Sequence, residues 1–309
     1  MSFKGRDIIR IEDLKEDEIY KILDVAERMV PVARGEETSD LLYGKVLASM
    51  FFEPSTRTRL SFETAMHRLG GSVITISGQE GTSLKKGETL ADTIRMAEGY
   101  SDVVVLRHPN EGAAALAAHF CSKPVINGGD GAGQHPTQTL LDLFTIRKEL
   151  GEIRGKTVAL VGDLRYGRTV HSLSLALARL GAKMIMVAPE LIQMPSYILE
   201  EIEALGGKYE ITESLERGVE EADVLYVTRI QRERFPDEEE YRKVAGSYRI
   251  TKEGLEGCKE HMIIMHPLPR VDEISPEVDL TPHAKYFIQA FNGVPVRMAI
   301  LSLVLGVIE

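Results

Sequence analysis

Cysteine is scarce in this chain, with 2 among 309 residues. Cys121 and Cys258 lie far apart and form no CxxC pair, which excludes a disulfide framework and a cysteine-rich zinc site. The chain also lacks HExxH or any similarly spaced ligand set, so the sequence predicts no bound metal. Cysteines that form neither a disulfide framework nor a zinc site fit a reducing compartment, and we therefore expect a cytoplasmic protein.

Long apolar segments are missing as well. The N-terminus has no apolar signal-peptide core. The longest apolar run, residues 298–308, is shorter than the roughly 20 residues needed to cross a bilayer. We therefore expect no association with a membrane.

Net positive charge is absent too, because the formal net charge is −10. A protein that binds nucleic acid normally presents a basic face, so the charge argues against that class. No internal repeat of about 20–50 residues is visible, which excludes solenoids and propellers.

Short aliphatic runs recur along the chain between helical patterns. Apolar runs with little alternation indicate strands covered on both faces, as in a parallel sheet. Strands alternating with helices predict an α/β fold of two doubly wound parallel-sheet domains joined by interdomain helices. The predicted strands are residues 45–51, 73–77, 102–107, 124–126, 157–162, 184–188, 223–228 and 262–265.

Glycine and proline mark the ends of three predicted helices. The first begins near Thr56 and ends at Gly70, the second runs from Pro136 to Gly151, and the third begins near Arg168. We place the first domain at residues 1–134 and the second at residues 135–291. A C-terminal helix, residues 292–309, is expected to complete the first domain.

The segment 51–59 leaves an apolar strand, turns at proline and enters a helix. A helix start offers free amides and a favourable dipole to an anion. An ordinary helix cap with solvated arginines is the alternative. Arginine in a first helical turn opposes the helix dipole, however, so a bound phosphate at Arg57 is the favoured interpretation.

Cations recur at the ends of other predicted elements. Taken singly, each suits an ordinary surface position, but together they favour small polyanionic substrates with phosphate and carboxylate groups. The residues are Lys86, Arg107, Arg168 and Arg229. The turn at residues 161–169 lacks GxGxxG spacing, so a dinucleotide site is not expected.

These segments resemble the aspartate and ornithine carbamoyltransferases over nearly the whole chain. FFEPSTRTRLSFE (51–63) resembles the carbamoyl-phosphate signature of that family. Further matches are TSLKKGETLADT (82–93), LRHPNEGAA (106–114), QHPTQTLLDLFTI (134–146), VGDLRYGRTVHSL (161–173), YVTRIQRERF (226–235) and HPLPRVDEI (266–274).

The second half is similar to the aspartate branch of the family. It has HPLP at residues 266–269 where the ornithine enzymes carry HCLP, and it lacks their SMG motif. Two arginines suit a dicarboxylate and would repel the side-chain ammonium of ornithine. A carbamoyltransferase for another amine acceptor, such as ornithine, and an inactive scaffold subunit remain the alternatives.

The resemblance implies the substrates carbamoyl phosphate and L-aspartate, with a role for each motif residue. Residues implied to bind carbamoyl phosphate are Ser55, Thr56, Arg57, Thr58, Ser83, Arg107, His135, Gln138, Leu268 and Pro269. Those implied to bind aspartate are Lys86, Arg168, Arg229 and Gln231. Those implied to act in catalysis are His135, Arg107, Thr58, Arg57 and Lys86.

The resemblance further implies that no cofactor is needed and that the Leu268–Pro269 bond is cis. Ser83 and Lys86 would reach in from a neighbouring subunit, which implies a homotrimer with shared sites. Lys85 is the alternative to Lys86. A regulatory chain is a further partner that the family allows.

Overall fold

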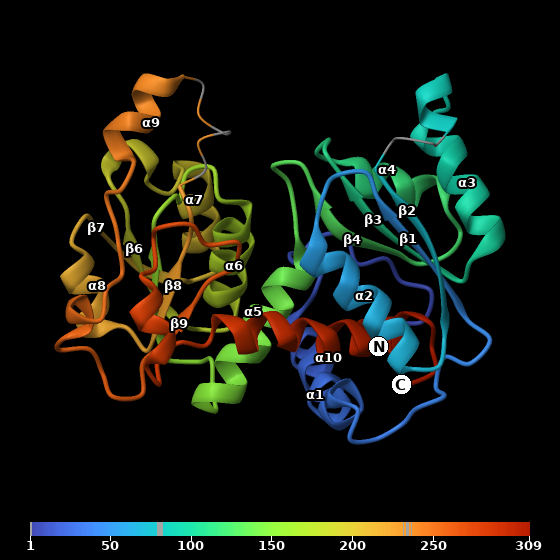
Figure 1. Ribbon diagram of the computed structural model, residues 1–309, viewed down its shortest axis with the longest axis horizontal. Helices are drawn as coiled ribbons and strands as arrows, with labels where there is room; N and C mark the ends of the chain where they lie inside the picture. Colours follow the sequence, from blue (N-terminus) through green and yellow to red (C-terminus); the bar gives the residue numbers. More distant parts are fainter. Residues whose placement is uncertain (1, 79–82, 231, 233–234, 236) are drawn as a thin grey trace. The chain divides into compact units, whose positions relative to one another are not determined.

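The computed structural model describes residues 2–78, 83–230, 232, 235 and 237–309 (Figure 1). The chain forms two compact units, one of residues 1–144 with 291–309 and the other of residues 145–290. The unit boundaries fall inside α5 (Pro136–Leu150) and α10 (Tyr286–Val304).

The first unit is built on a parallel four-stranded sheet with the order β2-β1-β3-β4. Its strands are β1 (Val46–Phe51), β2 (Ser72–Ser77), β3 (Val103–His108) and β4 (Val125–Asp130). Its other helices are α1 (Glu16–Arg34), α2 (Thr56–Arg68), α3 (Leu90–Tyr100) and α4 (Ala113–Phe120).

Alternation along β1 explains why helices lie on both faces of this sheet. Ala48 and Met50 pack in one core cluster with residues of α3 and α4. Ser49 points to the other face, where its hydroxyl donates to Glu63 of α2 at 3.0 Å. The sheet is therefore doubly wound.

The second unit contains a parallel five-stranded sheet with the order β7-β6-β5-β8-β9. Its strands are β5 (Thr157–Val161), β6 (Lys183–Val187), β7 (Lys208–Thr212), β8 (Val224–Val227) and β9 (Ile263–Met265). Its helices are α6 (Arg168–Arg179), α7 (Ser196–Ala204), α8 (Leu215–Glu221) and α9 (Glu238–Val244).

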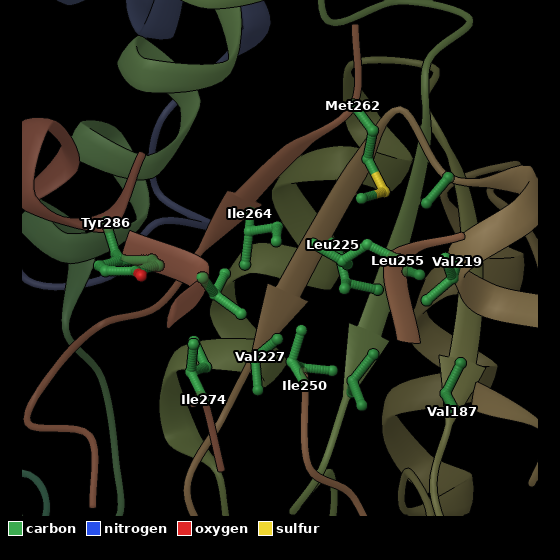
Figure 2. Packing of buried hydrophobic residues seen from close by; sticks show 14 of the residues in the cluster. Val187, Val219, Leu225, Val227, Ile250, Leu255, Met262, Ile264, Ile274 and Tyr286 are labelled. Carbon is green, nitrogen blue, oxygen red and sulfur yellow. The ribbon is translucent and has the colours of Figure 1, made fainter. Parts of the chain in front are cut away.

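The core of the second unit lies between the sheet and the segments that cover it. A cluster of buried hydrophobic side chains forms this core, and Figure 2 shows Leu225 and Val227 of β8 in it. The cluster also includes Val219 of α8 and Ile264 of β9. Burial of so many aliphatic side chains supplies most of the drive for folding.

The α/β fold class is confirmed, and every predicted strand is present, although β4 runs on to Asp130. The expectation that all strands are covered on both faces is wrong for β2, an edge strand with Ile74 42% exposed. β7, an edge strand of the second sheet, was not predicted. The reason is that β7 mixes Lys208 and Glu210 with few apolar residues.

The C-terminal helix differs from the expected residues 292–309, because α10 runs from Tyr286 to Val304 with Pro295 inside it. By length and mean hydropathy, 1.4, α10 could cross a membrane, which the shorter predicted run could not. However, 78% of the 18-residue apolar stretch of α10 is buried inside the structure, as expected for the core helix of a folded protein.

Candidate active site

The start of α2 has the features of an anion site. Ser55 is its extended N-cap residue, and no acidic residue lies in the first turn of this fully described helix. Thr56 and Arg57 are exposed there, whereas Thr58 is buried. The free amides, the hydroxyls and the forked Arg57 cation suit a phosphate group.

Thr58 and His135 are brought together, although they are far apart in the sequence. The Thr58 hydroxyl lies 3.4 Å from Nε2 of His135, and both side chains are 5% exposed. His135 directly precedes α5, so two helix starts meet at this point. A carbonyl oxygen held here would face both polar groups.

Arg107 lies beside Glu53. Glu53 was not among the site residues predicted from the sequence. The guanidinium of Arg107 is 2.7 Å from the Glu53 carboxylate and donates to the carbonyl of Gly128 at 3.1 Å. Phe51 of β1 pairs with Arg107 of β3, so Glu53 leaves the adjacent strand end. A bound anion would compete with Glu53 for this cation.

Gln138 lies on the first turns of α5, where its amide donates to the carboxylate of Asp142 at 2.9 Å. Asp142 is fully buried. Apart from Ser83 and Lys86, the predicted site residues of the first unit therefore come from the start of α2, the end of β3 and the start of α5.

Arg297 of α10 is a second residue that the sequence analysis missed. It is 3% exposed, donates to the hydroxyls of Ser61 at 2.8 Å and Thr137 at 3.3 Å, and lies 4.9 Å over the ring of Phe62. Burial lowers its pKa to about 9, opposed by Asp142 and assisted by Arg107. A lone arginine in an apolar helix was its only sequence signal.

Lys85 and Lys86 lie in a short 3-10 helix, Ser83–Lys86, and both are exposed. Residues 79–82, which directly precede this helix, lie outside the described residues.

In the second unit, two arginines follow neighbouring strands. Arg168 is the first residue of α6 and is 7% exposed, and Arg229 follows β8 and is half-buried. β5 and β8 pair side by side, and both arginines come after their carboxyl ends, where ligands bind in open α/β sheets. Gln231, which was expected to bind aspartate together with these two arginines, lies outside the described residues.

Leu268 and Pro269 follow β9, the neighbour of β8. The predicted cis bond between Leu268 and Pro269 is confirmed. Leu268 is also the one described residue other than glycine with a positive φ, at 55°. The described residues include no group of three or more His, Cys, Asp or Glu placed to hold a metal ion.

Two domains of one known family match the two parts of the chain. Residues 6–148 match the carbamoyl-P binding domain of aspartate/ornithine carbamoyltransferases. Residues 154–304 match the Asp/Orn binding domain of the same family.

Whole relatives match as well. The aspartate carbamoyltransferase catalytic subunit of Thermococcus kodakarensis is 59% identical, with 100% of this chain and 99% of that protein covered. The corresponding subunit of Archaeoglobus fulgidus is 60% identical, with coverages of 97% and 99%.

Solved structures agree with these matches. Aspartate transcarbamoylase from Trypanosoma cruzi, in complex with carbamoyl phosphate and aspartate, is 44% identical with a TM-score of 0.93, and 98% of each chain is covered. The catalytic subunit of the M. jannaschii enzyme is 54% identical with a TM-score of 0.89, covering 96% of this chain and 97% of that one. The chain belongs to the aspartate/ornithine carbamoyltransferase family.

Proposed function

We propose that the chain transfers the carbamoyl group of carbamoyl phosphate to the amine of L-aspartate, giving N-carbamoyl-L-aspartate and phosphate, in pyrimidine biosynthesis. The observation that carries the proposal is the pair of cationic strand ends. One lies in each unit, at Arg107 and at Arg168 with Arg229. Catalytic subunits of aspartate carbamoyltransferases that match the full chain support the same assignment.

Residues 1–134 with the C-terminal helix form the carbamoyl-phosphate domain in this proposal. Ser55, Thr56, Arg57 and Thr58 hold the phosphate at the start of α2, where the helix dipole and the cation stabilise it. As phosphate leaves, this cluster neutralises the charge that develops on it.

The carbamoyl carbonyl is polarised by three groups. Thr58, Arg107 and His135 can donate to the oxyanion that forms when the amine attacks the carbonyl carbon. The Thr58 hydroxyl and Nε2 of His135 lie 3.4 Å apart, which supports contact of both groups with the same carbonyl oxygen. Gln138, in the first turn of α5, binds the carbamoyl group beside them.

Residues 135–291 form the aspartate domain. Arg168, Arg229 and Gln231 bind the two carboxylates, and the carbonyl of Leu268 accepts from the reacting amine, with Pro269 beside it. Two arginines after adjacent strands support a dicarboxylate acceptor and disfavour ornithine, whose ammonium they would repel. Holding two mutually repelling anions in position then accounts for much of the rate acceleration.

The proposed assembly is a cytoplasmic homotrimer with shared active sites. Ser83 and Lys86, or Lys85 in its place, reach the site of the neighbouring subunit. The exposure of both lysines supports this arrangement. A regulatory chain is a further proposed partner, and the reaction requires no cofactor.

Phosphate release from carbamoyl phosphate tests the function, with L-aspartate and L-ornithine supplied as separate acceptors. We expect turnover with aspartate alone. Turnover with ornithine alone would overturn the assignment of the second unit, and turnover with neither acceptor would support an inactive subunit. Sedimentation of the purified chain, with and without substrates, tests the trimer.

A further inference from the structure

The loop after β9 is organised around His266, which is 2% exposed. The backbone amide of Leu268 donates to its Nδ1 at 2.7 Å. An amide can only donate, so Nδ1 is unprotonated and Nε2 carries the proton. Nε2 lies 2.7 Å from the carboxylate of Glu273 and donates to it.

Glu273 closes the loop from its other end and is 7% exposed. Its second carboxylate oxygen accepts from the backbone amides of Val271 at 3.0 Å and Asp272 at 3.1 Å. Burial would raise the pKa of Glu273, but the bond from His266 and the backbone amides lower it to about 2. The carboxylate is therefore ionised at neutral pH and accepts all three donors.

The same histidine is attached to α10. Its backbone amide donates to the side-chain oxygen of Gln289 at 2.8 Å, and Gln289 is 1% exposed. His266 thus links the loop to a buried helix, while its ring links the two ends of the loop. The segment 266–273 is held by two buried polar side chains of its own, His266 and Glu273, and by Gln289 of α10.

Leu268 is the residue that this network constrains. Its φ of 55° lies in the left-handed region, which a branched residue adopts only when its surroundings impose it. The hydrogen bond from its amide to His266 fixes the peptide plane before Leu268, and the bonds that Glu273 accepts from Val271 and Asp272 fix the chain beyond it. The backbone is therefore held on both sides of Leu268, which restrains the direction of its carbonyl.

A second histidine–carboxylate pair in the same unit provides a comparison. Nε2 of His261 lies 2.8 Å from Asp223, which also accepts from the backbone amide of Thr157 at 2.7 Å. Thr157 begins β5 and Asp223 directly precedes β8, so this pair lies at the amino ends of the strands. It is chemically similar to the first pair but remote from the carboxyl-end loops.

We propose that His266 and Glu273 are positioning residues, which act through Leu268 to aim its carbonyl at the reacting amine of the acceptor. The proposal rests on the function proposed above for Leu268. Neither side chain touches the substrate; the pair fixes a backbone acceptor. A loosened loop would leave phosphate binding intact and would impair the attack by the amine.

The test variant is Glu273→Gln, with Asp223→Asn as the matched control. A glutamine has a single acceptor oxygen, so it cannot serve the donors on both carboxylate oxygens. Hydrogen exchange of a peptide spanning residues 262–275 reports loop order without requiring activity. Steady-state kinetics report kcat/KM for aspartate and the KM for carbamoyl phosphate.

For Glu273→Gln we expect faster exchange in the 266–273 segment and a loss of roughly 10²-fold in kcat/KM for aspartate, the scale of a misplaced reacting group. The KM for carbamoyl phosphate should stay within about twofold. Asp223→Asn should lower thermal stability with both kinetic constants unchanged. His266→Asn, whose oxygen can still accept from Leu268, should retain more activity than His266→Ala.

Unchanged exchange and unchanged kinetics in Glu273→Gln would overturn the positioning role. Faster exchange with full activity would show that Glu273 orders the loop, but it would overturn the role of Leu268 in the reaction. Equal losses in the aspartate and carbamoyl-phosphate constants would show a general structural effect and would also overturn the inference. If Glu273→Gln does not fold, the two His266 variants decide between the same outcomes.

Discussion

The carboxylate of Glu53 lies 2.7 Å from the guanidinium of Arg107, at the ends of two strands that pair side by side. In the proposed reaction Arg107 must turn to the substrate, so Glu53 competes with the anion. We expect this competition to make the free enzyme bind carbamoyl phosphate more weakly than its cations alone would allow.

Glu53→Gln should therefore tighten the binding of carbamoyl phosphate by about 2- to 5-fold, the scale of a partly exposed ion pair. The side chain keeps its size but loses its charge. Calorimetric titration of the wild type and the variant measures the effect. Weaker binding by the variant would show that Glu53 supports the site rather than competing in it.

Arg57→Ala should lower kcat by about 10²–10³-fold, because the charge on the departing phosphate loses a forked cation. The KM for aspartate should change far less, since Arg57 belongs to the phosphate cluster. Phosphate-release kinetics at saturating aspartate measure the first effect. A variant with nearly normal turnover would contradict the assignment of Arg57.

Arg297→Met should reduce the free energy of unfolding by about 2–4 kcal/mol, because the buried hydroxyls of Ser61 and Thr137 lose their donor. Urea unfolding followed by circular dichroism measures the change. Arg297→Lys serves as the control, because it keeps the charge and should recover part of the loss. Equal stability of the methionine variant and the wild type would rule out a structural role for this arginine.

The lowered pKa of Glu273 predicts that the free energy of unfolding depends on pH in the acid range. The pKa of this carboxylate is lowered from 4.5 to about 2 in the folded chain. Its contribution is therefore complete above the unfolded value and is lost as pH falls from about 4.5 towards 2. The difference in unfolding free energy between the wild type and Glu273→Gln should shrink over that interval. A constant difference would mean that Glu273 does not titrate in this way.

Much of the site was predictable because helix starts and strand ends have local signatures. Thr56, Pro136 and Arg168 begin the helices that were expected to begin there. Glu53 and Arg297 were not predicted, since each acts through residues distant in the sequence. A strand register joins Glu53 to Arg107, and helix packing joins Arg297 to Ser61.

The sequence by itself determined the parallel α/β class, the strands rich in aliphatic residues and the cationic strand ends. These features follow from local composition and from the period of apolar residues. Only the tertiary structure decided that β2 and β7 are edges, that α10 begins at Tyr286, and that Glu273 holds His266. Burial and ion pairing of a side chain depend on residues brought close by folding, and no local pattern records those neighbours.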